Sequence, residues 1–100
     1  MDNTSIRSLR PDDIVRAGPL NPRVVDVEAL PNYHLKLLFT SDEVRIFDAR
    51  PYLSRGGVFK GLRDPAVFEE AWVEFGSVEW PCGVGLSYDT LYLKSVPVDA

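Results

Sequence analysis

The segment Trp72–Pro81 constrains the fold of this chain more than any other feature of its sequence. Two short runs rich in apolar residues flank the pair Gly76-Ser77, and a glycine at the first loop position is typical of a tight two-residue β-hairpin. This loop predicts one apolar face, because residues two apart along a strand point to the same side of a sheet. The residues on that face are Val73, Phe75, Val78 and Trp80, with Phe75 opposite Val78 and Val73 opposite Trp80.

The other face of the hairpin is charged, because the same register places Glu74 directly opposite Glu79. Like charges across a ladder repel each other unless water screens them, so we expect this face to be solvated. Trp72 lies on the same charged side. A tryptophan at the surface favours a protein interface, and the alternative is that Trp72 covers the end of a preceding helix.

Length, charge and cysteine content bound the class of the protein. One hundred residues are expected to form one domain of modest core size. The net charge of −4 argues against nucleic acid as a partner, because the chain has no surplus of Lys and Arg to bind phosphates. Cys82 is the only cysteine, so no internal disulfide can form, which is typical of a cytoplasmic protein.

The ends of the chain and its apolar runs predict neither a leader nor a membrane span. No apolar run reaches the roughly 18 residues that a membrane helix needs, and the N-terminus lacks the pattern of a signal peptide. Residues 1–21 are broken by proline and glycine, so we expect a weakly ordered adapter there. Residues 22–100 are expected to form a single domain.

Three segments near the start of that domain, residues 23–29, 34–40 and 43–48, alternate apolar and polar residues with the period of β-strands. We expect a three-stranded antiparallel meander in which Phe39 lies opposite Val44. The predicted inward residues are Val25, Val27, Ala29, Leu35, Leu37, Phe39, Val44 and Ile46.

The outer face of this meander is mixed rather than purely polar. The predicted register places Leu38 opposite Arg45 and Lys36 opposite Phe47. We expect something to cover such a face in part, since apolar side chains at a surface favour protein interfaces. The candidate interface residues are therefore Leu38, Phe47 and Trp72.

Helical segments are expected between the meander and the hairpin. Asp48 stands where it can cap a short helical turn directly after the third strand. Asp64-Pro65 is a strong helix start, because the carboxylate accepts hydrogen bonds from free amides and proline fits the first helical position. The main helix is predicted over residues 66–71, with Phe68 in its buried stripe.

After the hairpin, Pro81–Leu86 is expected to be an irregular loop. Asp89 stands where it can cap a last short helix, in which Leu91 and Tyr92 are packed. The tail from residue 96 onward is expected to fray. Together the segments predict an α+β fold: a small antiparallel sheet, formed by a three-stranded N-terminal meander plus a C-terminal hairpin, with one main helix and short helical turns.

The order of these landmarks resembles the DUF2442 family of small bacterial domains of unknown function. The resemblance covers about residues 22–94 and depends on the spacing of the whole set rather than on any one motif. Members usually show Asp-Gly between the second and third strands, where this chain has Asp42-Glu43. The residues that carry the resemblance are Asp48, Asp64, Pro65, Phe68, Gly76, Trp80, Pro81, Asp89, Leu91 and Tyr92.

The resemblance implies a small α+β fold and brings no established catalytic residue. Members are often encoded beside another small protein, in pairs that look like predicted toxin–antitoxin modules, and the chain would then be the antitoxin-like member. The implied partner is another small protein. The second predicted partner is another copy of the chain, in a homodimer, since the edges of a small antiparallel sheet allow strand addition.

The ionisable residues do not assemble a catalytic or metal motif in the sequence. His34 has no Cys or acidic residue at ligand spacing, and we expect Cys82 to be a half-buried thiol without a cationic setting. Asp48 and Asp89 could form an acid/base pair, but helix capping explains both. We therefore predict an interaction domain with no enzymatic activity, cofactor or metal. The alternative is a small ligand-binding domain or enzyme that uses the loop of residues 81–88.

Overall fold

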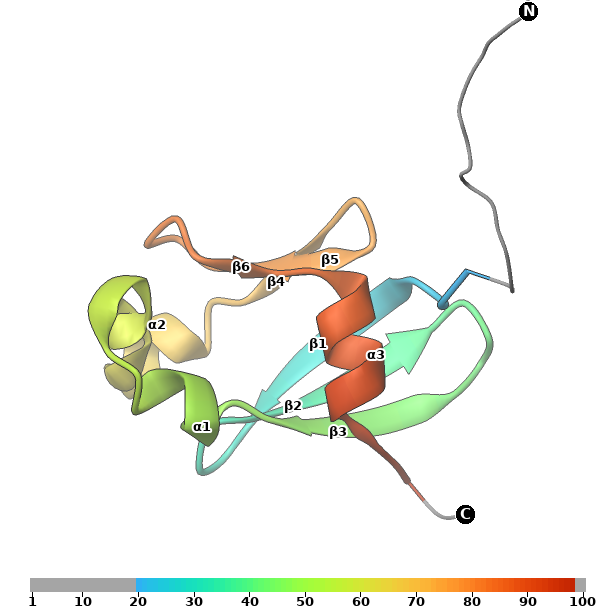
Figure 1. The fold of residues 1–100 in the computed structure, drawn as a ribbon, viewed down its shortest axis with the longest axis horizontal. Coiled ribbons are helices and arrows are strands. Elements are labelled where there is room, and N and C mark those ends of the chain that lie inside the picture. The colour runs from blue at the N-terminus through green and yellow to red at the C-terminus, as the bar shows by residue number, and fades with distance from the viewer. Residues whose placement is uncertain (1–19, 99–100) are drawn as a thin grey trace, which may run out of the picture.

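Two antiparallel sheets organise residues 20–98, the part of the chain that the structure, a computed structural model, describes. Most of the predicted adapter, residues 1–19, lies outside the described residues. The first sheet has the order β1-β2-β3-β7 and the second β4-β5-β6 (Figure 1), which confirms the predicted α+β class. The strands are β1 (Val24–Leu30), β2 (His34–Phe39), β3 (Val44–Asp48), β4 (Trp72–Glu74), β5 (Ser77–Glu79), β6 (Gly85–Leu86) and β7 (Val96–Pro97).

Short helices close one end and one face of the first sheet. The helices α1, η1 and α2 lie together at one end of the molecule, and α3 lies over the sheet on the side of β4–β6 (Figure 1). Their bounds are α1 (Arg50–Leu53), the 3-10 helix η1 (Gly57–Arg63), α2 (Pro65–Phe68) and α3 (Tyr88–Lys94). The helix predicted over residues 66–71 begins at Pro65, with Asp64 as its N-cap as expected, but it ends at Phe68.

Segments predicted to be connections or fraying ends are in fact regular. Residues 58–62 lie within η1, residues 85–86 form strand β6 beside β5, and residues 96–97 form strand β7 beside β3. The prediction of an irregular loop and a frayed tail was therefore wrong at these positions. A strand of two residues has no periodicity of its own, because it exists only through the neighbour with which it pairs.

The inward side of β2 matches the prediction, whereas the pairing of β3 differs by one residue. Leu35, Leu37 and Phe39 are buried, as predicted. Phe39 lies opposite Glu43 rather than Val44, because its N–H donates to the carbonyl of Glu43 (3.0 Å) and a three-residue loop joins the strands. Asp42 in that loop has a left-handed φ of 69°, which Asp tolerates better than most residues.

This change of register exchanges the faces of β3. Phe47 now lies opposite Leu35 and is fully buried, while Val44 lies opposite Leu38 on the outer face. The prediction that Val44 and Ile46 face inward was therefore wrong, as was the prediction of Phe47 on the surface. In the observed register the ring of Phe47 lies beside Leu35 and packs on Tyr52, with 5.6 Å between the ring centroids.

Strand β1 follows the predicted face along most of its length. Val27 and Ala29 pack against the core, as predicted, but Val25 is 51% exposed and Val24 is buried in its place. The pairing with β2 is irregular between Val24 and Asp26, and an irregularity of this kind shifts the alternation by one residue.

The hairpin of β4 and β5 also has a register different from the predicted one. Val73 lies opposite Val78, so the two-residue loop is Phe75-Gly76 rather than Gly76-Ser77. Phe75 and Gly76 have positive φ angles of 50° and 81°, as both central residues of a type I′ turn require. Phe75 consequently points outward and is 88% exposed, which contradicts the predicted inward position.

The charged side of the hairpin is likewise rearranged. Trp72 lies opposite Glu79, and Glu74 lies opposite Ser77. The two glutamates therefore do not face each other directly, and the repulsion expected from the predicted register does not arise. Trp72, Glu74 and Glu79 still share the outward face, as predicted.

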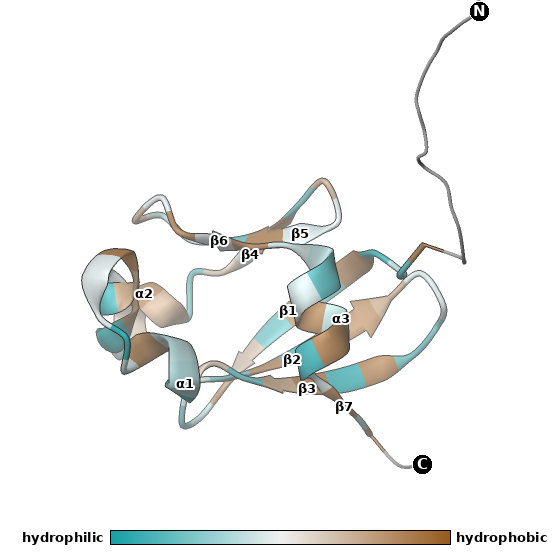
Figure 2. Ribbon diagram, in the orientation of Figure 1, coloured by the Kyte–Doolittle hydropathy of each residue, from teal (hydrophilic) through white to brown (hydrophobic). Residues whose placement is uncertain are grey.

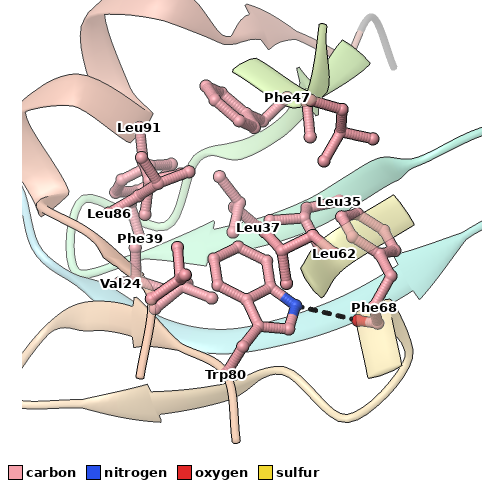
Figure 3. Close-up of a cluster of buried hydrophobic side chains, with 14 residues drawn as sticks. Val24, Leu35, Leu37, Phe39, Phe47, Leu62, Phe68, Trp80, Leu86 and Leu91 are labelled. Carbon is pink, nitrogen blue, oxygen red and sulfur yellow. Dashed lines mark hydrogen bonds between the residues drawn. The ribbon is translucent and has the colours of Figure 1, made fainter. Parts of the chain in front are cut away.

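Trp80 lies at the centre of the core between the two sheets. Its side chain is 1% exposed, its ring stacks on Phe68, and its Nε1 donates to the carbonyl oxygen of Phe68 (2.9 Å; Figure 3). The peptide bond to Pro81 is trans. Trp80 thus joins the second sheet to α2 and to the inward side chains of β2.

Candidate functional site

The three predicted interface residues lie in three different environments. Phe47 is buried in the core and was wrongly assigned to a surface. Leu38 is 36% exposed on β2, on the side of the first sheet that faces away from the core. Trp72 is 42% exposed on the outward side of the second sheet, where its Nε1 donates to Glu74 Oε1 (3.0 Å). The structure therefore does not bring these residues together into one surface.

Leu38 instead belongs to an apolar surface on the first sheet, which we call the outer face. Leu38 pairs with Val44, and Ile46 pairs with Val96 on the neighbouring strand. The N–H of Val98 donates to the carbonyl of Val44 (2.9 Å), which continues the same row. Residues directly opposite each other in a sheet point to the same side. The outer face consists of Leu38, Val44, Ile46, Val96 and Val98.

No element of residues 20–98 covers the outer face. The second sheet and α3 pack on the opposite side, where their core residues Val78, Trp80 and Leu91 contact the buried side chains of β2 and β3. Figure 2 shows apolar segments along the strands of the first sheet, β7 included. Val96 and Val98 are 66% and 48% exposed. Contiguous exposed apolar side chains of this kind mark binding surfaces more often than isolated ones do.

The rim of the outer face is mainly acidic. Two shallow hollows, of about 470 and 190 Å³, border it and share Lys36 and Val44 in their walls. The ionisable residues that line them are Asp26, Glu28, Lys36, Asp42 and Glu43. Glu43 is paired with Arg45, so Asp26, Glu28 and Asp42 outnumber the single ammonium group of Lys36 and give the surface a negative potential around an apolar centre.

Glu43 is the most firmly positioned of these carboxylates. Its Oε1 accepts hydrogen bonds from Ser41 Oγ (2.7 Å) and from the Tyr92 hydroxyl (2.8 Å), and its Oε2 accepts one from Arg45 Nη1 (3.1 Å). The hydrogen bonds from Ser41 and Tyr92, with Arg45 nearby, lower the pKa of Glu43, so it stays ionised. The hydrogen bond that the Tyr92 hydroxyl donates to Glu43 raises the pKa of this hydroxyl. This network links α3 to the rim of the outer face.

A second polar group lies at the other end of β3, around Asp48. Arg50 Nε and Nη2 donate to Asp48 Oδ1 (2.9 Å) and Oδ2 (2.8 Å), and the Arg50 backbone N–H donates to Oδ1 (2.9 Å). The hydrogen bond from the Arg50 side chain is the main cause that lowers the pKa of Asp48 to about 2. Asp48 thus accepts an amide at the start of α1 as predicted, although the cap residue itself is Ala49.

Asp48→Asn is expected to reduce the free energy of unfolding by about 1 kcal/mol at pH 7, because the partly exposed pair with Arg50 is screened by water. The folded pKa of Asp48, about 2, lies below its ordinary value of 3.8. The stabilisation is therefore complete above pH 5 and is lost as the pH falls toward 2. Urea unfolding of the wild type and the variant between pH 2 and 7 measures this difference.

Arg50→Gln provides the partner substitution in a double-mutant cycle. The double variant is expected to lose little more stability than either single variant, because both changes remove the same interaction. Fully additive losses would show that Asp48 and Arg50 stabilise the fold separately.

Of the residues considered for chemistry, the structure brings His34 and Asp48 together across the ladder of β2 and β3. His34 Nδ1 lies 2.9 Å from the Asn32 carbonyl, and its Nε2 lies 3.9 Å from Asp48 Oδ1. Sequence spacing missed this acidic neighbour because it lies directly across the ladder on β3. Cys82 is exposed, so the prediction of a half-buried thiol was wrong. Residues 20–98 contain no group of three or more His, Cys, Asp or Glu side chains that could hold a metal.

The remaining landmark residues cap a helix, form a hydrogen bond or pack in the core. Asp64 caps α2 by accepting from the Ala66 N–H (3.0 Å), as predicted. Asp89 does not cap α3, because Ser87 takes that position, and Asp89 Oδ1 accepts instead from Asn21 Nδ2 (2.9 Å). Leu91 is fully buried and Tyr92 packs against the core, as predicted.

The comparison with protein families matches residues 24–97 to the family described as "Protein of unknown function (DUF2442)". The chain belongs to the DUF2442 family. The match covers both sheets and all four helices, so the Asp48 group and every residue of the outer face except Val98 lie within the matched residues. No curated protein and no solved structure matches the chain. Within the described part of this DUF2442 protein, no helix is both long and apolar enough to cross a membrane.

Proposed function

We propose that this DUF2442 domain is a protein-interaction domain that binds its partner through the outer face. The observation that carries the proposal is an apolar sheet face, Leu38 with Val44, Ile46, Val96 and Val98, that residues 20–98 leave uncovered. Burying it against a partner removes apolar surface from water, which is the main driving force of association.

The chemistry of the rim specifies the partner further. Asp26, Glu28 and Asp42 lie around the apolar centre, and only Lys36 has the opposite sign. A second copy of the same face would bring carboxylates toward carboxylates, which disfavours a symmetric homodimer. We therefore propose a different protein with an apolar ridge flanked by Lys or Arg. The resemblance to DUF2442 members encoded beside another small protein supports the finer proposal of an antitoxin-like role.

The proposed role is binding without catalysis. Asp48 is paired with Arg50, and Asp89 is bonded to Asn21, so the two acids considered for acid/base chemistry have other partners. The loop of residues 81–88 contributes β6 and the start of α3, which gives it a packing role. These contacts favour an interaction domain over the alternative of an enzyme that uses this loop.

Val96→Asp is expected to weaken binding to the proposed partner, tested first as the product of the neighbouring gene, at least tenfold, because it places a charge in the apolar centre. Calorimetric titration of the purified pair measures the affinity. Val58→Asp is the matched control, since Val58 is similarly exposed (74%) but lies on η1, and it should leave the affinity unchanged.

Two outcomes would contradict the proposal. Equal affinity of the wild type and Val96→Asp would show that the outer face does not bind the partner. A concentration-dependent dimer of the domain alone, broken by Val96→Asp in sedimentation experiments, would assign the outer face to self-association instead.

A further inference from the structure

The segment of residues 49–63, which contains α1 and η1, has a charge opposite to that of the rest of the chain. It holds four cationic residues, Arg50, Arg55, Lys60 and Arg63, and no Asp or Glu. Because the whole chain has a net charge of −4, the residues outside this segment carry −8. The four cations of this segment lie at the end of the molecule where α1, η1 and α2 meet (Figure 1), and Asp48 and Asp64 flank the segment in the sequence. Such a local excess attracts anions despite the acidic character of the whole chain.

Arg63 is held in place at this end by its own fold contacts. Its Nε and Nη2 both donate to the carbonyl oxygen of Leu53 at the end of α1 (3.1 and 3.0 Å). The hydroxyl of Tyr33 donates to the backbone carbonyl of Arg63 from the turn between β1 and β2. The guanidinium group is therefore fixed before any ligand arrives, which lowers the entropy lost on binding.

Arg50 is fixed in the same way by the carboxylate of Asp48, which holds its Nε and Nη2. Among residues 20–98, no hydrogen bond uses Nη1 of Arg50 or of Arg63. Two positioned guanidinium groups thus each keep donors for a further acceptor. The Arg50 side chain is 60% exposed, so a ligand in solution can reach it.

Both arginines line one shallow cavity of about 440 Å³. Its wall combines these charged donors with one residue that carries a side-chain amide, two that carry a hydroxyl group, and the apolar Leu53. The lining residues are Asn32, Tyr33, Arg50, Leu53, Ser54 and Arg63. Charged donors beside an apolar wall group, in a hollow of several hundred cubic ångströms, are typical of small-molecule sites.

We propose that this cavity binds a small anionic ligand through an oxyanion, a carboxylate or a phosphate, held between Arg50 and Arg63. Arginine is suited to this role, because its planar donors match the oxygens of both groups. Asp48 offsets much of the charge of Arg50, so Arg63 supplies most of the net attraction. The site lies on different residues from the outer face and does not depend on the proposed partner.

Side-chain NMR tests the proposal with the Nε–Hε signals of the arginines in the full chain. Sodium phosphate and sodium acetate are titrated separately at constant ionic strength, with sodium chloride as the reference. Saturable shifts of the Arg50 and Arg63 signals with either oxyanion, and none with chloride, are expected. The anion with the lower dissociation constant identifies whether phosphate or carboxylate chemistry suits the site.

Variants distinguish specific binding of the anion in the cavity from a general attraction of anions to positive charge. Arg63→Gln is expected to weaken the saturable binding at least tenfold, and Arg50→Gln at least threefold. Arg55→Gln is the matched control, because Arg55 belongs to the same segment but stacks over Tyr52 (4.6 Å) and does not line the cavity. Non-saturating shifts, or an equal loss in Arg55→Gln and Arg63→Gln with all folds intact, would overturn the proposal.

Discussion

Trp80→Ala is expected to lower the free energy of unfolding by about 3–5 kcal/mol, the range found for large aromatic truncations in cores. Trp80 is the largest of the fully buried side chains, and it stacks on Phe68 with ring centroids 5.8 Å apart. Its removal leaves a cavity between the two sheets and also removes the donor to the Phe68 carbonyl. Urea unfolding followed by circular dichroism measures the loss.

Trp80→Phe separates the two contributions of this side chain. The phenyl ring keeps most of the apolar volume but leaves the carbonyl oxygen of Phe68 without its indole donor. We expect a loss of about 1–3 kcal/mol, which is the usual effect of an unsatisfied buried polar group combined with a small cavity. The control is Trp72→Ala on the outward side of the same sheet, with a loss of at most about 1 kcal/mol. A loss of stability below about 1 kcal/mol for Trp80→Ala would show that Trp80 does not belong to the core.

The sequence predicted the elements well where alternation and caps are local properties. The inward face of β2 follows directly from its alternating leucines, and the start of α2 follows from Asp64-Pro65. Strands β6 and β7 were not predicted, because two-residue strands depend on distant partners. Local sequence records alternation and helix caps, but it does not record which distant strand a short segment pairs with.

Both hairpin registers were predicted incorrectly, by one residue between β2 and β3 and by two residues between β4 and β5, and the cause is the same. Asp42 and Phe75 adopt positive φ angles of 69° and 50°, which non-glycine residues rarely do. The sequence therefore favoured Gly76 as the first loop position, although it is the second. A shift of one residue exchanges the two faces of a strand.

The candidate site inherited these errors of register. Leu38 was correctly placed on the outer face of the first sheet. Val44 and Ile46 were predicted to be core, and Val96 and Val98 were predicted to fray, so the other four residues of the outer face were missed. A useful signal was available in β3, where Phe47 offers more apolar area for burial than Val44 or Ile46.

Phe47→Ala is expected to destabilise the fold by about 3–5 kcal/mol, whereas Phe75→Ala should change the stability by no more than about 0.5 kcal/mol. The two substitutions remove the same atoms. Phe47 is 0% exposed, lies opposite Leu35 and packs near Tyr52 (5.6 Å between centroids), while Phe75 is 88% exposed at the tip of the hairpin. Denaturant unfolding of both variants in the same buffer measures the difference.

This pair of variants tests the registers of both hairpins directly, because the register predicted from alternation assigns the opposite costs. With Phe39 opposite Val44 and Phe75 opposite Val78, Phe47 would lie on the surface and Phe75 in the core. A large loss of stability for Phe75→Ala with a small one for Phe47→Ala would therefore reject the observed pairing of β2 with β3 and of β4 with β5. It would also return Val44 and Ile46 to the core and remove the apolar centre of the outer face, on which the proposed binding function depends.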